Sequence, residues 1–137
     1  MSTLITHNCL WFIMNNLLEV TGLINLGAIN DWGQVVGAYT LAENNQTVSY
    51  GFLRSPNGLF TTLGAVNPTG INDLGEITGF TTGTSLLSGF LRSPFGMLET
   101  FQVPGAIQTI PRAISNSGAI AGLYQDSAQS LHVFIRR

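Results

Sequence analysis

The chain has 137 residues, of which 45% are hydrophobic and only 9% charged, and its formal net charge is −2. This length suits one domain with a core of its own. The five basic residues are scattered arginines, too few to neutralise a row of phosphates, so we expect neither nucleic acid nor an anionic membrane surface as a partner.

The first 22 residues contain no positively charged region, and Asn15 and Asn16 interrupt their apolar run. We therefore expect no secretory signal peptide in this sequence. The run from Leu10 to Met14 is far shorter than the roughly 18 residues of a membrane-spanning helix. Cys9 is the single cysteine, which excludes an intrachain disulfide, and we expect it to be a buried packing residue.

A ten-residue motif then occurs three times. Residues 28–37 read AINDWGQVVG, residues 70–79 read GINDLGEITG, and residues 113–122 read AISNSGAIAG, at spacings of 42 and 43 residues. A second motif, Gly-Phe-Leu-Arg-Ser-Pro, follows at residues 51–56 and 89–94 and is weaker at 133–136. A fixed period near 40 is typical of a stack or ring of small structural units.

The repeats predict a single repeat domain spanning residues 1–137. Its expected parts are a partial unit at 9–27 and units at 28–69, 70–112 and 113–137. Within the second unit, turn signals separate four short segments without helical periodicity: Thr69–Asn72, Glu76–Thr81, Leu87–Arg92 and Met97–Phe101. We therefore predict an all-β fold of four-stranded antiparallel units.

The phase of the repeat leaves one strand over. Leu17–Val20 aligns with Leu59–Thr62 as a fourth strand, whereas the last unit stops after its third. If the spare strand meets the last unit, the N- and C-terminal strands close one sheet. If it does not, unpaired sheet edges are exposed and association is expected.

The motif Ile-Asn-Asp-x-Gly-x-Ile/Val-x-Gly, followed by an x-x-Phe-Leu strand, resembles the HAF-type bacterial extracellular repeats. The likeness covers about residues 9–137. The family's His-Ala-Phe triplet reads Tyr50-Gly51-Phe52, Ser88-Gly89-Phe90 and His132-Val133-Phe134 here, so only the last copy keeps the histidine. The resemblance implies an extracellular, propeller-like protein and carries over no catalytic residue.

Three units are fewer than the four to eight blades of a typical β-propeller. Two chains would supply about six, so we predict propeller-like blades and a homodimer that completes a ring. Three four-stranded units also suit a closed threefold β-trefoil or β-prism, which we keep as the alternative.

Candidate ligand-binding residues lie in turns and at strand ends, where repeat scaffolds usually carry binding groups. Trp32 stands where the other copies have leucine and serine, and an exposed indole stacks on sugars or partner surfaces. Arg54 and Arg92 recur at strand ends and could grip carboxylates or sugars. Five further residues offer amide or carboxylate groups to a hydroxyl-rich ligand: Asn44, Asn45, Gln46, Gln125 and Asp126.

The sequence contains no recognisable catalytic or metal-binding set. Asp31 and Asp73 are replaced by Asn116 in the third copy, which favours a turn role over a metal site. His7 and His132 have no acid, cysteine or serine partner at a motif spacing. We expect no cofactor.

The expected function is therefore that of a non-enzymatic β-repeat module for binding or assembly, with a carbohydrate or a protein as ligand. A carbohydrate-binding, lectin-like domain is the first alternative. A hydrolase with its site at a ring axis is the second, and it requires converging acids or histidines.

Overall fold

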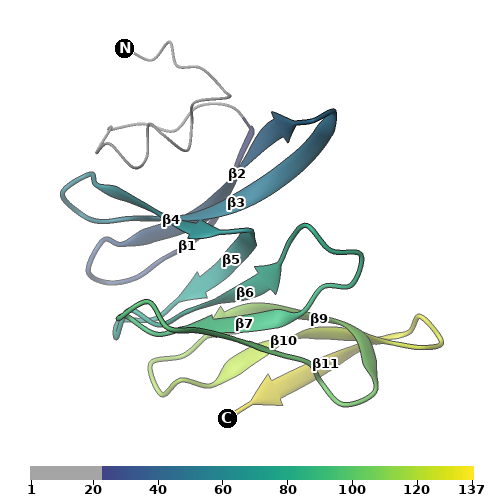
Figure 1. Ribbon diagram of the computed structural model, residues 1–137. Helices are drawn as coiled ribbons and strands as arrows, with labels where there is room; N and C mark the ends of the chain where they lie inside the picture. The colour runs from purple at the N-terminus through teal and green to yellow at the C-terminus, as the bar shows by residue number, and fades with distance from the viewer. Residues whose placement is uncertain (1–22) are drawn as a thin grey trace.

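The computed structural model describes residues 23–137, and the regular structure of this part of the chain is entirely β-strand (Figure 1). The strands in chain order are β1 Leu23–Ile29, β2 Val35–Glu43, β3 Gln46–Arg54, β4 Phe60–Gly64, β5 Val66–Ile71, β6 Ile77–Thr81, β7 Gly89–Arg92, β8 Leu98–Phe101, β9 Ala106–Ile114, β10 Ile120–Asp126 and β11 Leu131–Arg136. The prediction of an all-β fold is confirmed.

The strands form three separate antiparallel sheets, which we call sheets A, B and C. Sheet A has the order β1-β2-β3-β4, sheet B the order β5-β6-β7-β8, and sheet C the order β9-β10-β11. Sheet B lies between the other two (Figure 1). Three of the four strands expected in the second unit lie within two residues of their predicted bounds. The first begins earlier, at Val66, because Val66 and Pro68 are buried against sheet A.

Each Asn-Asp motif forms the turn between the first two strands of its sheet. In sheet B the side-chain Oδ1 of Asn72 accepts hydrogen bonds from the backbone N–H groups of Leu74 and Glu76, at 3.1 and 2.9 Å. Gly75 completes the turn at a φ of 83°, a backbone conformation that favours glycine. Asn30 makes the same two bonds in sheet A.

The turns also bond to one another from sheet to sheet. Asn30 Nδ2 donates to the carbonyl of Asn72 at 3.0 Å, and Asn72 Nδ2 donates to the carbonyl of Ser115 at 2.9 Å. The motif therefore sets the register between neighbouring sheets as well as the turn within each sheet.

A parallel set of bonds runs through the next residue of the motif. The backbone N–H of Asp31 donates to Asp73 Oδ1, and that of Asp73 donates to Asn116 Oδ1, both at 2.8 Å. Asn116 Nδ2 returns a bond to Asp73 Oδ2 at 3.0 Å. Asparagine in the third copy thus makes a two-way contact with its neighbour, which a second carboxylate would not.

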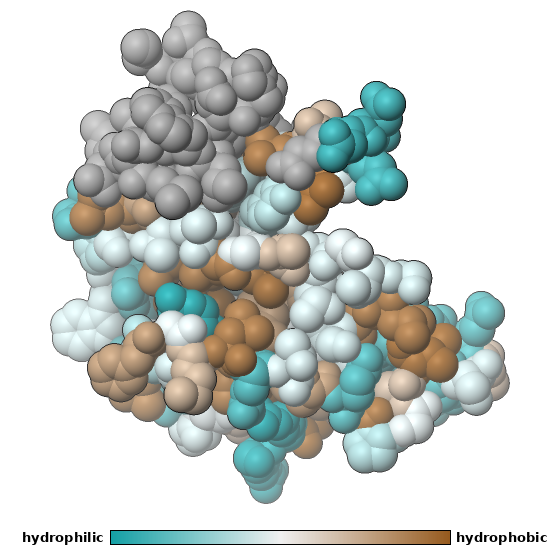
Figure 2. Space-filling model, viewed as in Figure 1, coloured by the Kyte–Doolittle hydropathy of each residue, from teal (hydrophilic) through white to brown (hydrophobic). Residues whose placement is uncertain are grey.

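The main apolar cluster lies between sheets A and B and consists of Val36, Val66, Ile71, Ile77 and Phe90. The repeated phenylalanines Phe52, Phe90 and Phe134 are all buried. Phe134 contacts Phe101 of sheet B edge to face. The exposed surface mixes polar and apolar patches (Figure 2).

Three sequence predictions concern Cys9, His7 and the spare strand Leu17–Val20, which lie outside the described residues. Residues 23–137 contain no helix with the length and hydropathy needed to cross a membrane.

Candidate functional site

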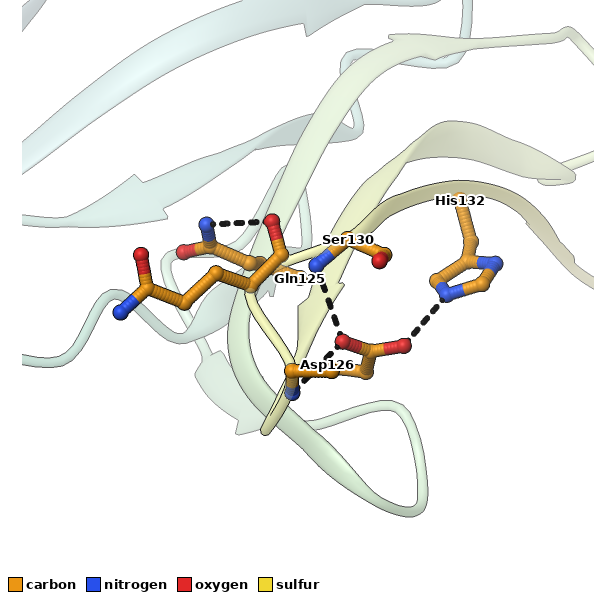
Figure 3. Close-up of polar contacts among 6 residues, drawn as sticks. Gln125, Asp126, Ser130 and His132 are labelled. Carbon is orange, nitrogen blue, oxygen red and sulfur yellow. Dashed lines mark hydrogen bonds and ion pairs between the residues drawn. The ribbon is translucent and has the colours of Figure 1, made fainter.

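The hairpin that joins β10 and β11 gathers several polar side chains around one carboxylate (Figure 3). Asp126 Oδ1 accepts hydrogen bonds from the backbone N–H groups of Ala128 and Ser130, both at 2.9 Å. Asp126 Oδ2 lies 2.8 Å from Nε2 of His132. The carboxylate therefore closes the hairpin and also holds the imidazole.

An aromatic surface lies beside this carboxylate. Tyr124 on β10 is paired with His132 on β11, and their rings stack at a centroid distance of 4.8 Å with an interplanar angle of 20°. The His132 side chain is 43% exposed. The two rings face each other and Tyr124 is half-buried, so a ligand can reach only the outer ring faces and edges. We call this stacked pair, which the Asp126 carboxylate flanks, the platform.

Amide groups border the hairpin on its other side. Gln125 Nε2 donates to the carbonyl of Gln129 at 3.2 Å, and Gln108 Nε2 donates to Gln125 Oε1 at 3.4 Å. Of the residues predicted from the sequence, Gln125 and Asp126 thus lie in this hairpin. Their neighbours Tyr124, His132 and Gln108 were missed.

His132 has an acid partner in the structure, although not at a motif spacing. Asp126 and His132 are six residues apart, a spacing that matches no catalytic motif. The tight hairpin nevertheless places them diagonally across facing strands, two residues from direct register and on the same face. The available signal was an acid and a histidine on either side of a turn.

The other predicted ligand residues lie elsewhere. Asn44 and Asn45 form the two-residue turn between β2 and β3, and their φ angles of 49° and 63° fit a turn of type I′. Their presence is thus explained by backbone conformation. They and the exposed Gln46 belong to sheet A, so the structure does not bring them together with Gln125 and Asp126 in sheet C.

Trp32 lies in the turn after β1 and is 68% exposed. Its indole N–H donates to the carbonyl of Asp73 in the neighbouring turn at 3.0 Å. The polar group of this side chain therefore serves sheet-to-sheet contact, while one ring face remains open to solvent.

The recurring arginines do not converge. Arg54 and Arg92 each donate to the carbonyl of the residue that follows, at 3.5 and 3.3 Å. Burial lowers the pKa of the Arg92 guanidinium. Arg136 instead pairs with Glu99 at 2.7 Å and lies over the Phe101 ring.

Neither the Asp73 carboxylate nor any other acid of residues 23–137 belongs to a cluster able to hold a metal ion. Hydrogen bonds from the Asp31 backbone N–H and the Asn116 amide lower the pKa of Asp73, which keeps its carboxylate ionised between the turns.

Comparison with known proteins adds no assignment: no protein-family model, no curated protein and no solved structure matches the chain. The class that the fold and the hairpin define is therefore an all-β protein of three antiparallel sheets with an exposed Tyr-His-Asp group.

The hairpin should respond to acid. The bond from His132 first, and then the Ser130 N–H, lower the pKa of Asp126 below its ordinary value of 3.8. Such a carboxylate adds stability that is fully present above the unfolded pKa and is lost as pH falls through the lowered folded pKa. We expect the amide NMR signals of Ala128 and Ser130 to shift only below about pH 4.

Asp126→Asn provides the matched control, because an amide oxygen still accepts both N–H groups but has no charge to lose. The acid-induced shifts should disappear in this variant. If they persisted, another group would be responsible.

Proposed function

We propose that this chain is a non-enzymatic β-repeat module that acts by binding or assembly. The supporting observation is that the recurring polar residues make structural contacts between sheets. Asn30, Asn72 and Asp73 hold one sheet to the next, and none of them points a free reactive group at a shared cavity. Propeller-type packing of the units and an extracellular location belong to this proposal and rest on the repeat motif and the family resemblance.

Among the described residues, the Asp126–His132 pair is the feature that resembles catalytic machinery. Within residues 23–137 the contacts of the imidazole are with Asp126 and Tyr124, and no nucleophile is bonded to it. A nucleophilic mechanism needs a hydroxyl or thiol within hydrogen-bond reach of its base. This favours a binding role for the hairpin.

Carbohydrate binding is the second candidate function, and the Tyr124–His132 platform favours it. Flat rings cover the apolar face of a sugar, while the Asp126 carboxylate on the same side of the hairpin accepts hydrogen bonds from its hydroxyl groups. The platform differs from the sequence prediction for this function, which placed the aromatic contact at Trp32.

A glycan array together with a hydrolase substrate panel tests both proposals. We expect no turnover on the panel. If a glycan binds, Tyr124→Ala should weaken it about tenfold, the loss of one stacking contact. Trp32→Ala is the matched control and should leave the affinity unchanged.

Two results would contradict these proposals. Turnover that His132→Ala abolishes would show that the chain is an enzyme. Glycan binding that depends on Trp32 and not on Tyr124 would move the site from the hairpin to the turn after β1.

A further inference from the structure

Sheet C lacks the fourth strand that sheets A and B possess, so within residues 23–137 the outer edge of β11 is unpaired. Asp126 N–H donates to the Ser130 carbonyl, and hydrogen-bonded pairs alternate along an antiparallel ladder. His132, Phe134 and Arg136 therefore bond to β10. It follows that the backbone N–H and C=O groups of Val133 point outward, as a fourth strand would require.

Few features of β11 discourage pairing with another strand. The strand contains no lysine or proline, its charged residue Arg136 is already paired with Glu99, and its register with β10 is unbroken from Leu131 to Arg136. Natural edge strands usually carry a charge, a proline or a bulge that prevents association. Here the alternate residues are apolar and exposed: Leu131 at 63%, Val133 at 74% and Ile135 at 61%.

An apolar groove lies beside this edge. It has a volume of about 300 Å³ and runs between the segment after β8 and β11, lined by Phe101, Gln102, Val103, Pro104, Phe134, Ile135 and Arg136. The groove lies along the outer edge of β11 in sheet C. At the corresponding edge, sheets A and B have their fourth strands, β4 and β8. It can receive the side chains of an added strand.

Sheet A, at the opposite end of the stack, is exposed at a position that is buried in sheets B and C. Leu26, Pro68 and Pro111 hold the same register in sheets A, B and C, each opposite a glycine of the repeat. Pro68 and Pro111 are fully buried, whereas Leu26 is 70% exposed. The first sheet thus leaves open a position that is buried in both following sheets.

We propose that two copies of this chain exchange strands, each supplying the fourth strand on the β11 edge of the other. The supplied segment is Leu17–Val20, which lies outside the described residues. Its sequence Leu-Leu-Glu-Val resembles the Met97–Thr100 sequence Met-Leu-Glu-Thr at β8. This inference rests on the proposed function, because it names the partner for assembly.

The short span of the chain before β1 favours a second copy, rather than the same chain, as the source of the fourth strand. Two residues lie between Val20 and Leu23 at the start of β1, and the three Cα–Cα steps span at most about 11 Å. Sheet B separates sheets A and C, and packed sheets lie roughly 10 Å apart, so β11 is about 20 Å or more from β1. Reciprocal exchange avoids this limit and closes a two-copy assembly.

At Val133, the contact proposed between two copies differs from the contacts between sheets within one chain. It occupies the position of Gly51, where a Cβ would lie only 2.9 Å from the Val66 side chain of the next sheet. A valine keeps a partner sheet from approaching as closely. We therefore assign the association to backbone pairing along β11 rather than to face-to-face packing.

Light scattering after size exclusion of the full chain tests the exchange. We expect twice the chain mass of 14.7 kDa. Val133→Pro removes only an outward N–H and should halve the mass without changing the far-UV circular dichroism. Val133→Ala keeps the N–H and should remain a dimer, which separates strand pairing from apolar adhesion.

Val20→Pro tests the supplied strand and should also give a monomer. Mixing it with Val133→Pro leaves one intact junction and should restore a dimer. A native monomer, masses that grow with concentration, or a dimeric Val133→Pro would each overturn the exchange. A monomer that still binds glycans without turnover would overturn the exchange and leave the proposed function standing.

Discussion

Replacing Asn72 by alanine is expected to destabilise the protein by about 3 kcal/mol or more, because one buried amide serves several partners. The side chain of Asn72 is 3% exposed. It accepts from Leu74 and Glu76, and it donates to Glu76 Oε1 and to the Ser115 carbonyl. Alanine removes these four bonds at once, at a position that is itself buried.

Asn72→Ser separates the two tasks of this side chain. Serine stands at the equivalent position in the third copy, where the Ser115 hydroxyl still accepts from Ala119 but makes no bond to a further sheet. We expect Asn72→Ser to cost about 1–2 kcal/mol, from the lost sheet-to-sheet bond. Urea denaturation of both variants measures the difference. No loss in Asn72→Ser would mean that the bond to Ser115 contributes nothing, and equal losses in the two variants would mean that the turn bonds kept by serine contribute nothing.

The strands and turns could be predicted from the sequence because their determinants are local. Asn-Asp-x-Gly fixes a tight turn through hydrogen bonds within five residues, and Gly33, Gly75 and Gly118 have the positive φ expected of them, at 78°, 83° and 86°. The alternation of apolar residues after each turn then defines the buried face.

The contacts between sheets could not be predicted in this way. The sequence marks Asn72 as a turn residue, but its partner across the sheets is a backbone carbonyl, which every residue has. Trp32 shows the same limit, since its indole bonds to the carbonyl of Asp73. Only spacings of 43 and 41 residues, close to the repeat period, relate these groups.

Only part of the candidate site could be predicted, because the rest depends on contacts between strands. Gln125 and Asp126 were chosen for their chemistry in a polar loop, and they lie in the hairpin. Tyr124 and His132 join them through strand register, which depends on the length of the turn between β10 and β11. That turn contains Gln129 at a φ of 65°, unusual for a residue other than glycine, asparagine or aspartate.

Replacing Gly79 by alanine is expected to cost more than about 4 kcal/mol, the largest effect of a single methyl group in this fold. A Cβ at this position would overlap the carbonyl oxygen of Asn67 and lie 2.7 Å from the Pro68 Cα and 2.8 Å from the Phe90 ring. The first two are backbone atoms of the paired strand β5 and yield only if the sheet distorts. Phe90 is fully buried, so the residues packed around it keep its ring from moving aside.

Gly83→Ala is the matched control, because Gly83 has a φ of +82° and open space around its Cα. Its cost should be about 1–2 kcal/mol, the price of a left-handed alanine. Thermal unfolding should show a small shift for Gly83→Ala and a far larger shift, or no folded state, for Gly79→Ala. Similar shifts would show that β5 can move.

The same close approach at Gly37 and Gly122 explains why every copy of the motif ends in glycine. In each copy a buried phenylalanine ring lies where a side chain would be.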